Sequence, residues 1–143
     1  MKTLSLFAVV LALLVPCIAR AEASPEAVMK QALTDFLTKP YRISYLLPPK
    51  KNRDPGPYSL NSSIDALPKL PRLEQISVVM SNSAKWSAEL TTIAKQAPDT
   101  VAARVIVAQI KTTIAALQAA TTDQAKTDQA LQQLAALKKL AGS

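Results

Sequence analysis

One basic segment brings together the residue types best suited to binding an anion. Lys50, Lys51 and Arg53 stand close together, and their positive charges would attract an anionic group. Three tyrosines lie nearby in the sequence, namely Tyr41, Tyr45 and Tyr58. This pattern predicts a contact for anionic lipid headgroups, an acidic protein, nucleic acid or a small anionic ligand. The alternative interpretation, which we favour, is a solvated loop whose tyrosines pack onto helices.

Trp86 is a second candidate, because tryptophan is enriched at the energetic centres of protein interfaces. It stands in a heptad pattern of apolar residues, so a core position is the simpler interpretation. The alternative is that Trp86 anchors the protein in the groove of a partner. A leucine stripe near the C-terminus is open to the same two interpretations, a closed bundle or a surface for another subunit. Its members are Leu131, Leu134, Leu137 and Leu140.

The residue types on which most enzymes depend are missing. The chain has no histidine, which is the commonest general base and metal ligand. The single cysteine, Cys17, lies in a segment that we expect to be removed, which excludes thiol catalysis and zinc–thiolate sites. The two glycines, Gly56 and Gly142, cannot build a phosphate-binding loop. The sequence therefore predicts a non-enzymatic protein without a cofactor or a metal site.

Residues 1–23 have the three parts of a secretory signal peptide. Lys2 supplies the positive start, residues 4–15 form the apolar stretch, and a small-x-small cleavage motif ends at Ala23. We place the cleavage after Ala23, because Ser24 then begins a helix. The apolar stretch is shorter than the roughly 20 residues that a membrane span requires. A periplasmic or secreted protein is therefore predicted, with no transmembrane span in the mature chain.

A lipoprotein is a poorer interpretation of the same segment. The residue before a lipidated cysteine is normally small, whereas Pro16 precedes Cys17. We therefore expect no lipid on Cys17. The mature chain would then contain no cysteine, so that packing or a partner must stabilise it instead of disulfides.

Positive charge is concentrated in one part of the predicted mature chain. The whole chain has 17 Lys and Arg against 10 Asp and Glu, and cleavage after Ala23 leaves 15 against 9. Five of the six excess charges lie within residues 39–72. A localised basic segment favours an anionic partner or surface. Nucleic acid is not expected, because it would need a broader basic face with interleaved aromatic residues.

Residues 24–39 predict a short amphipathic helix. Ser24 suits the N-cap, Pro25 suits the first helical position, and Pro40 ends the run. The expected apolar face consists of Val28, Met29, Ala32, Leu33 and Phe36.

Residues 40–71 contain seven of the ten prolines, so no long helix can pass through them. Apolar residues nevertheless recur, which indicates an extended strap lying over the helices instead of a free linker. We expect one short helical turn near Ile64. The apolar residues are Leu46, Leu47, Leu60, Ile64, Leu67 and Leu70.

Residues 72–143 carry the strongest helical signal. One heptad seam predicts a helix from Pro71 to about Ala97, formed by Ile76, Val79, Ser83, Trp86, Leu90, Ile93 and Ala97. A second helix should start near Thr100, with a seam of Ala103, Val107, Ile110, Ile114 and Leu117. Whether it continues unbroken to residue 141 is open, and we favour a break near Thr121 and Thr122. Thr121 and Gln124 would then form a capping box.

The sequence as a whole predicts an all-α protein, with residues 24–143 forming a single domain. We expect an antiparallel helical hairpin or a three- to four-helix bundle, with the Pro-rich strap over it. The expected function is that of an exported adaptor, chaperone or accessory subunit of an envelope or secretion assembly. It would bind an envelope protein or associate with itself through coiled-coil-like helices. An anion-binding module and, more weakly, a secreted toxin or enzyme inhibitor are the alternatives.

Overall fold

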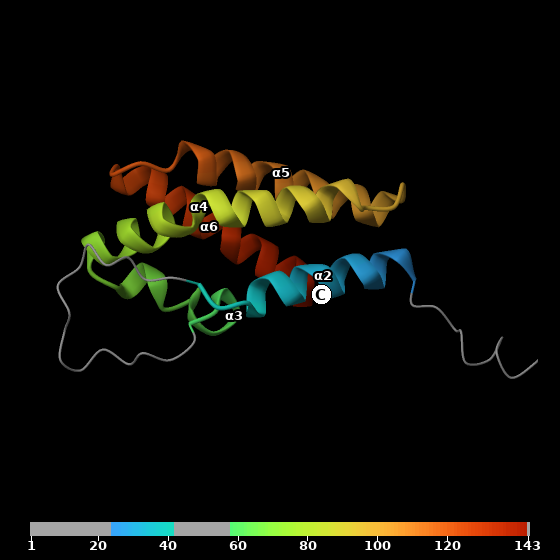
Figure 1. The fold of residues 1–143 in the computed structure, drawn as a ribbon, viewed down its shortest axis with the longest axis horizontal. Helices are drawn as coiled ribbons and strands as arrows, with labels where there is room; N and C mark the ends of the chain where they lie inside the picture. Colours follow the sequence, from blue (N-terminus) through green and yellow to red (C-terminus); the bar gives the residue numbers. More distant parts are fainter. Residues whose placement is uncertain (1–23, 42–57, 143) are drawn as a thin grey trace, which may run out of the picture.

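The computed structural model describes residues 24–41 and 58–142, and its regular elements there are all helical (Figure 1). An isolated bridge between Pro40 and Ser59 is the one β-type pairing within these residues. The all-α prediction is therefore confirmed. The elements are α2 (Pro25–Thr38), α3 (Leu60–Ser63), the 3₁₀ turn η1 (Leu67–Lys69), α4 (Arg72–Lys95), α5 (Val101–Ala119) and α6 (Gln124–Gly142).

Helix α2 begins as its sequence predicts. The Ser24 hydroxyl accepts a hydrogen bond from the Ala27 N–H at 3.2 Å, and proline occupies the first turn. The buried face consists of Met29, Leu33, Phe36 and Leu37. Val28 was predicted to join this face, and this is wrong, because its side chain is 58% exposed. It lies about 100° around the helix from Met29, and Leu37 occupies the core instead.

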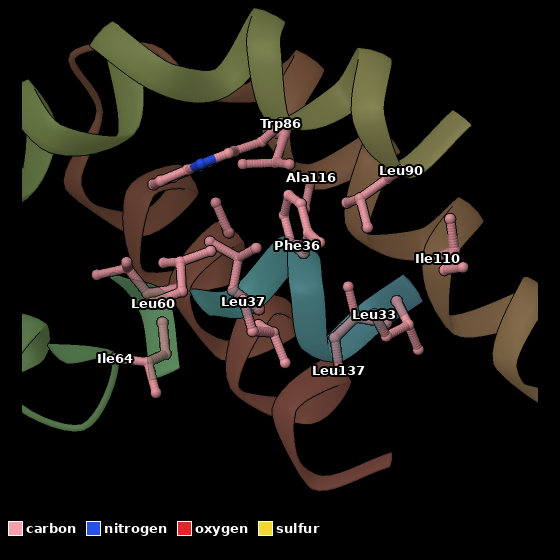
Figure 2. Close-up of a cluster of buried hydrophobic side chains, with 14 of the residues drawn as sticks. Leu33, Phe36, Leu37, Leu60, Ile64, Trp86, Leu90, Ile110, Ala116 and Leu137 are labelled. Carbon is pink, nitrogen blue, oxygen red and sulfur yellow. The ribbon is translucent and has the colours of Figure 1, made fainter. Parts of the chain in front are cut away.

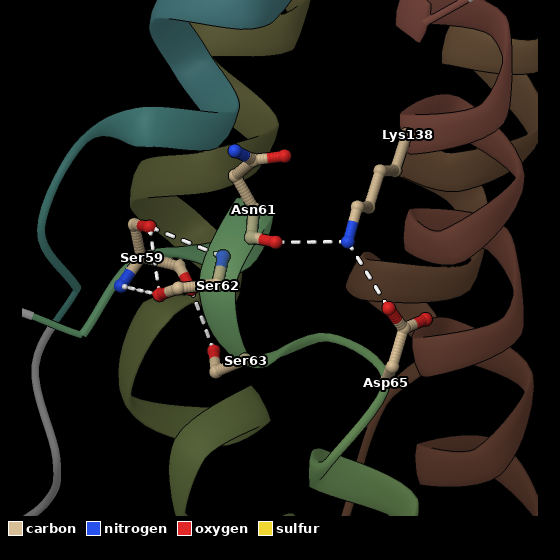
Figure 3. A network of polar contacts seen from close by, with 6 residues as sticks. All are labelled: Ser59, Asn61, Ser62, Ser63, Asp65 and Lys138. Atoms are coloured by element: carbon tan, nitrogen blue, oxygen red, sulfur yellow. Dashed lines mark hydrogen bonds and ion pairs between the residues drawn. The ribbon is translucent and has the colours of Figure 1, made fainter.

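The described part of the strap packs onto the bundle through α3 and η1. Leu60, Ile64 and Leu67 are buried, which confirms the predicted helical turn near Ile64. The Lys138 ammonium on α6 donates to the Asn61 carbonyl at 2.8 Å and to the Asp65 carboxylate at 3.1 Å (Figure 3). These contacts connect the strap to the last helix. Leu46 and Leu47 lie outside the described residues.

Helices α4 and α5 form the predicted antiparallel hairpin. Pro71 precedes the first turn of α4, where its missing N–H costs nothing. The chain turns through residues 96–100, and the Thr100 hydroxyl caps α5 by accepting from the Ala103 N–H at 3.2 Å. Figure 1 shows the two helices side by side along one edge of the molecule.

The C-terminal helical stretch is broken, as predicted, because α5 ends at Ala119 and α6 begins at Gln124. The prediction of a capping box that begins at Thr121 is wrong. The Asp123 carboxylate instead accepts from the Ala125 N–H at 2.8 Å, and the Thr121 hydroxyl accepts from the Asp123 N–H at 3.3 Å. A carboxylate satisfies the free N–H groups of a first turn and also favours the positive end of the helix dipole.

Four long helices share one hydrophobic core. Helix α4 packs on α5, α5 packs on α6, and α6 crosses to pack on α2 (Figure 1). Figure 2 shows the centre of this core, where Phe36 and Leu33 of α2 lie among residues from the other helices. All of the predicted seam residues on α4 and α5 are buried or half-buried. The arrangement is thus the four-helix form of the predicted bundle.

Candidate functional site

The basic residues of the predicted anion contact cannot be placed. Tyr45, Lys50, Lys51 and Arg53 lie outside the described residues, so this contact stays a prediction. The residues that flank this part of the chain are held together, because the Tyr41 N–H donates to the Tyr58 carbonyl at 2.9 Å.

The structure brings together the other three candidate residues as an aromatic cluster. The rings of Tyr41 and Trp86 meet edge to face, with centroids 5.8 Å apart and an interplanar angle of 76°. The ring of Tyr58 also contacts that of Tyr41, with ring centroids 6.1 Å apart and an interplanar angle of 35°. An edge-to-face pair such as Tyr41 and Trp86 stabilises the fold beyond the area that it buries. The aromatic cluster therefore connects Tyr41 and Tyr58 to Trp86 of α4.

Each buried member of the aromatic cluster serves the core. Trp86 is 4% exposed, in agreement with the simpler interpretation of this residue. The Tyr41 hydroxyl makes a hydrogen bond of 2.7 Å with the Ser63 hydroxyl. Burial raises the pKa of Tyr41 above its usual value, and the contact with Ser63 opposes this shift in part. The Tyr41 hydroxyl is thus engaged within the fold.

The acidic side chains of the described residues have structural roles. Within residues 24–41 and 58–142, no three His, Cys, Asp or Glu side chains are placed to hold a metal ion. A groove of about 510 Å³ between the strap and α6 holds the carboxylates of Asp65 and Asp128. Asp65 pairs with Lys138, and Asp128 accepts from the Gln124 side chain. Both carboxylates therefore have structural partners.

The outer face of α5 is an uncharged surface that the described part of the fold leaves open. Six residues with the spacing 4, 3, 4, 3, 4 run along the whole helix, and all six are exposed. None is charged, and Val101 and Val105 are 78% and 56% exposed. We call this surface the outer stripe of α5. It consists of Val101, Val105, Ala108, Thr112, Ala115 and Ala119.

Sequence reasoning missed the outer stripe, although its heptad spacing is visible in the sequence. The helix carries two apolar seams, and only the one that continues the hairpin was assigned to the core. By length and composition α5 could cross a membrane, with a mean hydropathy of 1.2, but the core helix of a soluble protein passes the same test. Only 33% of the apolar stretch of α5 is buried, so its hydropathy comes from apolar residues on both the buried and the exposed face of the helix.

A polar flank borders the outer stripe on the side of α4. Arg104, Lys111 and Gln118 form this flank, since residues seven apart lie on one side of a helix. Both charged members are basic, and α5 contains no acidic residue. The Asp99 carboxylate accepts two hydrogen bonds from Arg104, at 3.0 and 2.6 Å. No ion pair to Lys111 is found within residues 24–41 and 58–142.

A shallow groove of about 480 Å³ lies between α4 and the C-terminal end of α5, where Gln118 ends the flank. Its α4 wall is built of small side chains, and its α5 wall includes Gln118. Ser87 lines this groove while being only 7% exposed, and its hydroxyl has no hydrogen-bond partner among the residues that the structure describes. A buried hydroxyl without a partner costs free energy, which makes this an unsatisfied position next to an open surface. The residues of the α4 wall are Ser83, Ala84, Ser87, Ala88 and Thr91.

No protein-family model matches the chain, and no curated protein or solved structure shows significant similarity to it. The functional argument therefore rests on the chain's own residues and surfaces.

Proposed function

We propose that the protein is an exported, non-enzymatic helical adaptor, chaperone or accessory subunit that binds its partner through the outer stripe of α5. The observation that carries this proposal is the exposure of six uncharged residues along a helix of about 28 Å. Contiguous apolar surface of this kind is typical of interaction sites. A helix-in-groove or helix-on-helix contact would use the same heptad spacing.

The predicted export supports an envelope partner. A signal peptide at residues 1–23 would deliver the mature chain to the periplasm or the outside of the cell. N-terminal sequencing of the protein from an envelope fraction tests this step, and Ser24 is the expected first residue. A cytoplasmic protein that retains Met1 would contradict the exported part of the proposal.

Site-specific photo-crosslinking in the source cells tests the contact itself. A benzoyl-phenylalanine in place of Ala119, the exposed last residue of the outer stripe, leaves Val101, Val105 and Lys111 intact. We expect a discrete adduct with an envelope protein. The same group in place of the exposed Gln129 on α6 is the control and should give none. No adduct at residue 119, or equal adducts at both positions, would overturn the proposed contact.

A further inference from the structure

The outer stripe of α5 belongs to a wider surface that includes part of α4. The polar flank of Arg104, Lys111 and Gln118 separates the stripe from the small-residue wall of the 480 Å³ groove. On the α4 side, Ala84 and Ala88 are exposed and lie in that wall. Small residues on both sides of the flank allow another backbone to approach closely. The surface thus fits an elongated, narrow object such as a helix.

The charge on this surface has one sign. Asp99 forms an ion pair with Arg104 at the N-terminal end of α5. Lys111 lies near the middle of the helix without an ion pair in the described part of the chain. An occupant that covered Lys111 without supplying a carboxylate would bury an unpaired charge, which is costly. Charge complementarity therefore requires an acidic group opposite Lys111.

A second copy of this chain fits this surface poorly. An antiparallel two-fold contact along the outer stripe would have its axis between Ala108 and Thr112. Lys111 lies beside this axis, so the two copies would bring their Lys111 ammonium groups together. A parallel contact would oppose Val101 to itself at one end and Ala119 to itself at the other, which prevents even packing. Neither arrangement supplies a carboxylate.

A membrane surface also fits poorly. Helices that lie in the membrane interface bury bulky residues such as Trp, Phe and Leu. The outer stripe has none of these, because two valines are its largest side chains. Alanine and threonine contribute little to lipid insertion but suit close helix packing.

From these observations we infer that the face formed by α5 and the neighbouring wall of α4 binds an amphipathic helix of another protein, with a carboxylate of that helix paired with Lys111. This inference rests on the proposed function and specifies the chemistry of the partner. The apolar edge of the bound helix lies on the outer stripe.

The experiment uses the crosslinker at position 119 in the full chain and maps the partner segment by mass spectrometry. We expect an amphipathic helical segment with Asp or Glu beside its apolar edge. Lys111→Glu should lower the adduct yield about tenfold or more, because like charges at an interface are strongly unfavourable. Lys126→Glu, at an exposed lysine on α6, is the matched control and should leave the yield unchanged. Substitution of the mapped acidic residue of the partner with lysine should restore the adduct with the Lys111→Glu variant.

The outcomes separate this inference from the proposed function. No adduct at position 119 overturns both the proposed function and this inference. An adduct with lipid, with a second copy of the chain, or with a segment that lacks carboxylates leaves a contact at α5 but overturns the acidic helix. An unchanged yield with Lys111→Glu also overturns it, provided that circular dichroism shows the variant to be folded.

Discussion

The inner and outer faces of the α4–α5 hairpin differ in environment although they share the same heptad spacing. On the inner faces, Trp86 and Leu90 of α4 and Ile110 of α5 are 4%, 0% and 0% exposed (Figure 2). On the outer faces, Met80 of α4 is 45% exposed and Val105 of α5 is 56% exposed. Periodicity identifies apolar faces on a helix but does not state which of them the fold covers. A face left uncovered is then available to a partner.

Trp86→Ala should have the largest effect on stability. Truncation of a buried tryptophan in a packed core costs about 3–5 kcal/mol, and this change also removes the edge-to-face contact with Tyr41. Urea denaturation followed by circular dichroism measures it. Met80→Ala on the outer face of the same helix is the control, with a loss below about 1 kcal/mol expected. Equal losses would mean that the outer face is also covered in solution.

Ile110→Ala and Val105→Ala make the same comparison within α5. The inner substitution leaves a cavity at a fully buried site and should lower the free energy of unfolding by about 2–5 kcal/mol. The outer substitution should change it by less than about 0.5 kcal/mol. Thermal and urea unfolding of the two purified variants supply the measurement. A large loss with Val105→Ala would contradict an outer stripe that is open in the isolated protein.

Tyr41→Phe sharpens the account of the inner aromatic cluster. Loss of the hydrogen bond to Ser63 should cost about 1 kcal/mol at neutral pH. Because the folded pKa of Tyr41 is raised, its contribution to stability is complete below the unfolded pKa of about 10 and decreases as the pH rises toward the folded value. Urea unfolding of the wild type at pH 9 to 11 should therefore show a decline that is weaker in the variant. Parallel declines in the two proteins would argue against a buried Tyr41 hydroxyl.

Ser87→Ala should have a small effect of the opposite sign. Removal of an unpartnered buried hydroxyl, together with the better helix propensity of alanine, should stabilise the isolated protein by roughly 0.5–1 kcal/mol. Ser81→Ala changes an exposed serine of the same helix and controls for propensity alone. If Ser87→Ala destabilises the protein, the hydroxyl already has a partner in solution, and the groove is not the unsatisfied position described above.

Much of the fold could be predicted, because helix boundaries depend on local chemistry. Ser24, Pro25, Pro71 and Thr100 act through hydrogen bonds and φ angles within one turn of their own positions, and each was assigned correctly. The second break was placed correctly, but its cap was assigned to Thr121 instead of Asp123, since several residues there can cap. The outer position of Val28 was missed for a different reason, because burial depends on where other helices lie.

The candidate site shows the same division between features that depend on local sequence and features that depend on packing between helices. Trp86 belongs to a heptad seam, and its core position follows from that pattern. Its contact with Tyr41 joins residues 45 positions apart in sequence, which no local pattern encodes. The outer stripe was present in the spacing of α5, yet its exposure depends on α2, α4 and α6 packing elsewhere.

The sequence by itself determined the helical class, the helix ends, the apolar seams and the scarcity of catalytic groups, because these depend on residue type and on contacts within a few turns. Only the tertiary structure decided which seam of α5 is buried, that Tyr41 and Tyr58 meet Trp86, and that Ser87 lacks a partner beside an open groove. The physical reason is that burial depends on long-range packing. Four helices can cover only some of the apolar faces that they present to one another.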